Sequence, residues 1–240
     1  MLPWLLIIIV MVASCNRNDV PNGNFESGMD AYARGDFDAA MKTWRPLADK
    51  GDPAAQTNMG FLYYEGKGVT RDYKEAVKWY RMAAVTGYPD AAFNMGVAYS
   101  EGKGVDRNPD EALRWYRLAA DSGYAPAQVI LGNNYFRGDG VAVDHQEAAN
   151  WYMKAAEQGD VVAQFLIANL YISGQGVPQD LVKAYQWLSV AATANHPDAK
   201  KNSDRAKQQI AGHMMPAQIA QAEKLAREWI AKKAAKAANQ

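Results

Sequence analysis

The chain has 240 residues, of which 49% are hydrophobic and 22% are charged, and its 26 basic residues balance its 26 acidic residues. This composition suits a folded core, and the absence of net positive charge argues against nucleic-acid binding. With one cysteine, the chain cannot form an intramolecular disulfide bond.

The N-terminus has the features of an export signal. Residues 1–14 carry no charge, and 2–12 is apolar apart from Pro3. This stretch is shorter than the roughly 18 apolar residues of a membrane-spanning helix, and it is typical of a signal peptide. The tetrapeptide 12–15, Val-Ala-Ser-Cys, resembles the lipobox of bacterial lipoproteins. The resemblance implies removal of residues 1–14 and attachment of lipid, including palmitate, to Cys15; a free cysteine in an uncleaved anchor is the alternative.

Residues 15–24 are rich in Asn, Asp, Pro and Gly and predict a lipidated tether. In lipoprotein sorting, aspartate directly after the lipidated cysteine implies retention in the inner membrane, so Asn16 favours the outer membrane. We therefore expect a lipid-anchored protein of the bacterial cell envelope that faces the periplasm.

Residues 25–54 predict a divergent half-repeat that precedes a regular array. The segment contains Gly35-Asp36-Phe37 and Trp44 but lacks the Gly-x-Gly-Val motif found further along. It is similar to a tetratricopeptide unit with a shorter turn.

From residue 55 to 198, a block of 36 residues occurs four times without a gap. In the first copy the recurring residues are Ala55, Gly60, Tyr63, Gly66, Gly68, Val69, Ala76, Trp79 and Ala83. Each recurs at the same spacing in the later copies, except that Ala168 replaces the first glycine in the fourth. A period of this length predicts stacked helical units, which present an extended surface more readily than a catalytic pocket.

Each block predicts two helices, an A helix followed by a B helix. Ala55, Met59 and Tyr63 share one face of the first A helix. Gly60 costs about 1 kcal/mol relative to alanine inside a helix, so its recurrence predicts close approach of a second helix. Residues 66–69 end the A helix, and 72–75, Asp-Tyr-Lys-Glu, predicts a capping box that starts the B helix.

One tryptophan recurs in every B helix, which could indicate either core packing or an aromatic ligand-binding box. The four are Trp79, Trp115, Trp151 and Trp187. Because their spacing equals the repeat period and alanines surround them, core packing is the better interpretation.

The block resembles the Sel-one-like repeat, a branch of the tetratricopeptide superfamily. The resemblance covers residues 55–198 and implies an all-α, right-handed α-solenoid whose A helices line the concave side. It also implies binding of a partner protein or peptide without catalysis. Family analogy leaves an alternative, binding or hydrolysis of cell-wall peptides or β-lactams. The lack of cysteines in the repeats departs from the members to which those activities are attributed.

The variable positions of the A helices are the best candidates for partner binding. Apolar and amide side chains occur together there, which suits an extended or helical peptide. The predicted partner-binding residues are Asn58, Phe61, Tyr64, Asn94, Asn133, Phe136 and Asn169. Packing against neighbouring A helices is the alternative for each of them.

Residues 199–240 predict two helices that cap the array, followed by a basic tail. Residues 200–240 contain nine basic and three acidic residues. Lys232, Lys233 and Lys236 could contact anionic lipid or an acidic partner, or form a solvated helix end. No catalytic, cofactor-binding or metal-binding motif is found, and the three histidines form no pair with metal-ligand spacing.

Overall fold

A computed structural model describes residues 23–194 and 197–238 of the chain. These residues form twelve helices and no strand, which confirms the predicted all-α repeat fold. The helices are α1 (Gly23–Ala33), α2 (Phe37–Asp49), α3 (Pro53–Glu65), α4 (Tyr73–Ala84), α5 (Pro89–Glu101), α6 (Pro109–Asp121), α7 (Ala125–Arg137), α8 (His145–Gln158), α9 (Val161–Ser173), α10 (Leu181–Ala191), α11 (Pro197–Ala211) and α12 (Pro216–Ala238). They divide into two compact units, unit 1 (Met1–Tyr124, containing α1–α6) and unit 2 (Ala125–Gln240, containing α7–α12).

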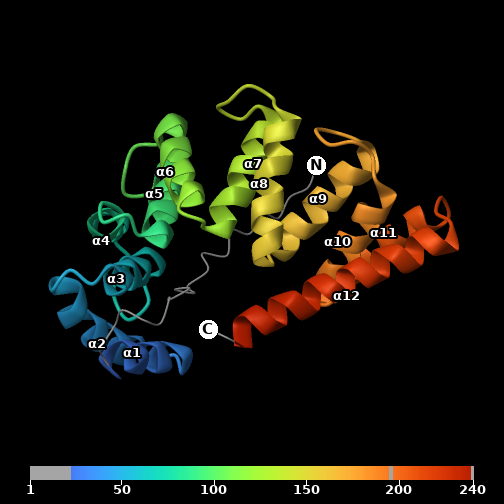
Figure 1. Ribbon diagram of the computed structural model, residues 1–240. Coiled ribbons are helices and arrows are strands. Elements are labelled where there is room, and N and C mark those ends of the chain that lie inside the picture. The colour runs from blue at the N-terminus through green and yellow to red at the C-terminus, as the bar shows by residue number, and fades with distance from the viewer. Residues whose placement is uncertain (1–22, 195–196, 239–240) are drawn as a thin grey trace. The chain divides into compact units, whose positions relative to one another are not determined.

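Unit 1 is a stack of helix pairs, α1 with α2, α3 with α4 and α5 with α6 (Figure 1). Successive pairs also contact each other, because α2 lies against α3 and α4 lies against α5. The A helices of the first two repeats are α3 and α5, and the corresponding B helices are α4 and α6. The core of this unit is therefore continuous from one pair to the next.

A glycine–tyrosine contact sets the distance between the A and B helices in three repeats. The pairs are Gly60 with Tyr80, Gly96 with Tyr116 and Gly132 with Tyr152. A Cβ atom on any of these glycines would lie only 2.5–2.6 Å from the tyrosine ring. Carbon atoms in contact are normally about 3.5–4.0 Å apart, so no larger residue fits without displacement. The predicted close approach of a second helix is confirmed.

Residues 23–49, which include most of the segment 25–54, form a complete helix pair, α1 and α2. A Cβ atom on Gly28 would lie 2.7 Å from Cδ1 of Trp44, so this pair uses the same close approach, with tryptophan in place of tyrosine. Trp44 is fully buried and its Nε1 donates a hydrogen bond to the carbonyl oxygen of Phe25 at 3.2 Å. The helix pair α1–α2 thus differs from the repeats chiefly in its shorter turn, at Gly35.

The B helices begin where predicted, but only half of the capping box forms. The side chains of Asp72, Asn108, Asp144 and Asp180 each accept a hydrogen bond from a backbone N–H of the first turn. The predicted reciprocal bond from Glu75 to the cap is wrong, because the backbone N–H of Asp72 already donates to the carbonyl oxygen of Tyr63 at 3.0 Å. Glu75 pairs instead with Lys78 at 2.7 Å. This arrangement ties the repeated tyrosine of the A helix to the start of the B helix.

The repeated tryptophans support core packing rather than a ligand-binding box. Trp79, Trp151 and Trp187 are 5–7% exposed. Trp115 is partly buried. In unit 2 the ring of Trp187 packs edge-on against Trp229 of α12, with 5.6 Å between ring centroids.

Unit 2 contains the pairs α7–α8 and α9–α10, followed by α11 and α12, which both pack against α10 (Figure 1). The two helices predicted after residue 198 are therefore present. Ile219, Ala226 and Ile230 of α12 pack into the core of unit 2. The opposite side of α12 is polar and exposed, as a terminal cap requires.

The predicted signal peptide 1–14 and Cys15 lie outside the described residues, as does most of the tether 15–24. The helix α1 starts at Gly23 and includes the last two tether positions. Among the described residues, no helix combines the length and the apolar character needed to cross a bilayer.

Candidate interaction surface

Four of the seven predicted partner-binding residues are interior side chains of unit 1. Asn58, Phe61, Tyr64 and Asn94 are each 4–6% exposed. Asn58 contacts Met29 of α1, and the ring of Phe61 packs against Tyr32 of α1. Tyr64 donates a hydrogen bond to Glu101 of α5. Residues 54–62 and 91–98 are buried without interruption. These four positions serve packing in unit 1 and offer a partner almost no area.

The other three residues, Asn133, Phe136 and Asn169, lie on α7 and α9 of unit 2 and are partly exposed. Oδ1 of Asn133 accepts a hydrogen bond from the Tyr152 hydroxyl at 2.8 Å, which fixes the amide. The ring of Phe136 packs against His145, with 4.9 Å between ring centroids. These contacts hold the side chains in place while part of each remains accessible.

The two repeats of unit 2 present the same pair of groups at equivalent positions. Asn133 and Asn169 are 36 residues apart, as are Phe136 and the partly exposed Ile172. An amide can bond a peptide backbone, and an apolar side chain can anchor a peptide side chain. Unit 2 therefore presents one partly exposed amide and one partly exposed apolar side chain at the same positions of both repeats.

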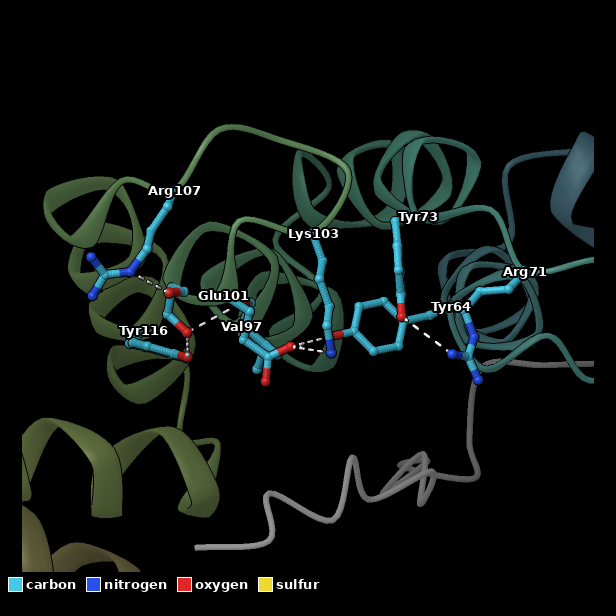
Figure 2. Close-up of polar contacts among 9 residues, drawn as sticks. Tyr64, Arg71, Tyr73, Val97, Glu101, Lys103, Arg107 and Tyr116 are labelled. Atoms are coloured by element: carbon cyan, nitrogen blue, oxygen red, sulfur yellow. Dashed lines mark hydrogen bonds and ion pairs between the residues drawn. The ribbon is translucent and has the colours of Figure 1, made fainter.

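A polar network in unit 1 surrounds Glu101 at the C-terminal end of α5 (Figure 2). Its carboxylate accepts a hydrogen bond from the Tyr64 hydroxyl at 2.5 Å and pairs with Lys103 at 2.9 Å. Burial alone would raise the pKa of Glu101, but these two contacts hold it below its ordinary value. Burial, followed by the bond to Glu101, raises the pKa of Tyr64. Tyr64 is therefore a buried hydrogen-bond donor that links α3 to α5.

The lysines inside the Gly-x-Gly motifs of unit 1 contact aromatic rings. The Nζ of Lys103 lies 5.2 Å from the ring centroid of Tyr64 and 5.4 Å from that of Tyr73 (Figure 2). One repeat earlier, Nζ of Lys67 donates to the Tyr32 hydroxyl at 2.6 Å and lies over the Phe37 ring. In both cases the lysine of one repeat contacts aromatic residues of the preceding helix pair. A cation held over aromatic faces therefore joins successive helix pairs.

Asp90, in the first turn of α5, makes the stability of unit 1 depend on pH. Burial raises the pKa of its carboxyl to about 6, from an ordinary value of 3.8. Between pH 4 and 6 the unfolded chain loses this proton and the folded chain keeps it, so stability falls as the pH rises through about 6. We expect Asp90→Asn to raise the free energy of unfolding at pH 7.5 by about 1–2 kcal/mol, with little effect at pH 4.

Urea denaturation of both proteins at these two pH values checks the expectation. An equal change at both values would show that the effect does not come from the charge of Asp90.

The described residues contain no group of three or more His, Cys, Asp or Glu side chains arranged to hold a metal ion. His145 is partly buried against Phe136, and His213 is exposed in the turn between α11 and α12.

Comparison with known proteins agrees with this geometry. The sequence model of the Sel1 repeat family matches residues 53–84, 89–124, 125–160 and 161–196, more than half of the chain. The four matches begin at the first residues of α3, α5, α7 and α9. The repeat unit is therefore one A helix followed by one B helix. No curated protein sequence matches the chain closely enough to add to this comparison.

Among the solved structures that are similar to this one are the following three. A protective antigen of uropathogenic Escherichia coli strains, described as having an SLR fold, is 34% identical with a TM-score of 0.69. The alignment covers 85% of this chain but only 45% of the antigen, so the chain spans less than half of that relative's length. A Sel1 repeat protein from Oxalobacter formigenes is also 34% identical, with a TM-score of 0.65 and coverage of 73% and 72%. A sel1 repeat protein from Klebsiella pneumoniae, 18% identical with a TM-score of 0.51 and coverage of 76% and 90%, shares the fold.

Sel1 repeat proteins generally mediate protein–protein interaction and act as non-catalytic scaffolds. The family match extends over four consecutive repeats, and two relatives are 34% identical over most of this chain. The chain therefore belongs to the Sel1 repeat family.

Proposed function

We propose that this chain is a non-catalytic adaptor of the bacterial cell envelope, anchored by lipid on Cys15, that binds a protein or peptide on the A-helix face of its repeats. The general role of the family supports the binding function. The apolar segment 2–12 followed by Cys15 supports the anchor. Asn16 favours the outer membrane, with the repeats facing the periplasm.

The observation that carries the binding proposal is the repeated amide and apolar pair of unit 2. Asn133 with Phe136 on α7, and Asn169 with Ile172 on α9, remain partly exposed. Phe136 and Ile172 pack against the buried core of unit 2. A peptide that crosses both repeats would receive the same contact twice. Two weak contacts on one rigid support bind more tightly together than either does alone.

Site-specific photo-cross-linking in the bacterium that makes this protein tests the proposal. The photoreactive residue p-benzoylphenylalanine replaces Asn169 in one strain. In a control strain it replaces Asn150, which is exposed on the B helix α8. We expect one protein to be cross-linked from position 169 and not from position 150, because only the A-helix face is proposed to bind.

The same cross-link in a Cys15→Ala background tests the anchor. We expect the variant to leave the membrane fraction and the yield of the cross-link to fall. Equal cross-linking from positions 169 and 150 would contradict the binding face, and unchanged membrane association of Cys15→Ala would contradict the lipid anchor.

A further inference from the structure

A cleft in unit 2 lies between the C-terminal end of α8 and the last turns of α12. Its volume is about 600 Å³. The side chains that define it are Glu157, Gln158, Trp229, Lys232, Lys233 and Lys236. Clefts of roughly 300–1,000 Å³ are typical of ligand sites. The adaptor proposal assigns no role to this cleft.

The cleft carries three cations and one carboxylate. Elsewhere on α12 the basic residues have acidic partners on the same helix: Lys224 lies 3.8 Å from Glu228, and Arg227 lies 3.8 Å from Glu223. Within residues 23–194 and 197–238, no ion pair with a carboxylate is found for Lys232, Lys233 or Lys236. The positive charge of α12 is therefore balanced on most of the helix and unbalanced at the cleft.

The arrangement of Lys233 shows how the cleft is held. Its Nζ donates a hydrogen bond to the carbonyl oxygen of Gln158 and lies 5.2 Å from the ring centroid of Trp229. Burial, together with the nearby charge of Lys236, lowers the pKa of Lys233. Lys233 thus joins α12 to α8, and an anion bound beside it would offset the repulsion between the two lysines.

We infer that this cleft binds an acidic peptide segment, with carboxylates against the three lysines and an apolar group against Trp229. The inference rests on the proposed function, because it names the chemistry of a partner segment. A peptide suits the recess between two helices better than a lipid bilayer does, since a flat surface cannot enter it. Trp229 supplies an aromatic group, a class of side chain that is enriched at protein–protein interfaces.

The test measures the fluorescence anisotropy of fluorescein-labelled hexaglutamate with the full-length chain in non-ionic detergent. A labelled hexaserine peptide is the uncharged control. The cleft variant combines Lys232→Gln, Lys233→Gln and Lys236→Gln. The matched control variant combines Lys200→Gln, Lys201→Gln and Lys224→Gln, which removes the same charge from exposed positions on α11 and α12.

We expect wild type to bind hexaglutamate and not hexaserine. The cleft variant should weaken hexaglutamate binding by about tenfold or more, and the control variant by less than about twofold, because the three cleft lysines converge on one cleft and the control lysines do not line it. No binding by wild type, or equal weakening in the two variants, would overturn the inference. Co-sedimentation of wild type with phosphatidylglycerol vesicles, lost in the cleft variant without any peptide binding, would overturn it in favour of a membrane contact.

This assay measures binding at the cleft alone, whereas the cross-link from position 169 detects a partner on the A-helix face. A failure of the cleft inference would leave that cross-link unchanged. A failure of the adaptor proposal would remove the cross-link and leave hexaglutamate binding intact.

Discussion

Replacing Gly96 with alanine is expected to lower the free energy of unfolding by about 2 kcal/mol, although alanine is the better helix former by about 1 kcal/mol. The added Cβ would lie 2.6 Å from two carbons of the Tyr116 ring. Tyr116 is only 5% exposed and cannot turn away without displacing its neighbours. Urea denaturation followed by circular dichroism measures the loss.

The fourth repeat provides the matched rescue for this variant. Its equivalent positions hold Ala168 and Leu188, both fully buried, so a larger residue on the A helix faces a smaller one on the B helix. We expect Tyr116→Leu to be less damaging in the Gly96→Ala background than in wild type, with a coupling free energy of about 1 kcal/mol or more. Strictly additive effects of the two substitutions would show that the helix separation is not set by this contact.

The repeat pattern predicted those features of the fold that recur in every copy. Gly60 recurs as Gly96 and Gly132, and each glycine accepts the ring of a tyrosine on its own B helix. Both partners lie within one 36-residue block, so a single block contains the information needed to pair them. The same holds for the helix starts at Asp72 and its equivalents.

Contacts between blocks were harder to predict. The positions of Asn58, Phe61 and Asn94 vary between copies, which is typical of a binding surface, but in unit 1 all three are buried. Asn58 and Phe61 contact residues of α1, in the preceding helix pair. The periodicity defines the face that a helix turns to its own partner and does not define its distance from the next A helix. In unit 2 the equivalents Asn133 and Asn169 remain partly exposed.

The lysine–aromatic contacts were missed for a related reason. Lys67 and Lys103 occupy a variable turn position and therefore look like solvated residues. Their aromatic partners Tyr32 and Tyr64 belong to the preceding helix pair, and the turn of the first pair, α1–α2, is shorter. Tyr32 therefore precedes Tyr64 by 32 residues rather than 36, which hides the equivalence in an alignment of fixed period.

Replacing Gly104 with alanine is expected to be more damaging still, lowering the free energy of unfolding by about 3–4 kcal/mol. Gly104 is the second glycine of the Gly-x-Gly motif and has a φ of 78°, which favours glycine. A Cβ atom there would overlap the carbonyl oxygen of Tyr73 and lie 2.5 Å from its carbonyl carbon. Because these are backbone atoms of the preceding B helix, no side-chain rotation can relieve the overlap.

Gly123→Ala is the matched control, because it separates the cost of the backbone conformation from the cost of the overlap. Gly123 has a φ of 89°, and no atom lies within 4 Å of the position that its Cβ would occupy. We expect this variant to lose only about 1 kcal/mol, the cost of placing alanine at positive φ. Equal losses in the two variants would show that Gly104 matters only for its backbone conformation.

A larger loss for Gly104→Ala would assign the second glycine a role beyond ending the A helix. Gly176 in unit 2 meets the backbone of His145, at the start of the preceding B helix, in the same way. In each unit the loop of one repeat therefore rests on the first turn of the B helix before it. Stacking of the repeats depends on this backbone contact as well as on side-chain burial, because a side chain at the second glycine would hold two neighbouring repeats apart.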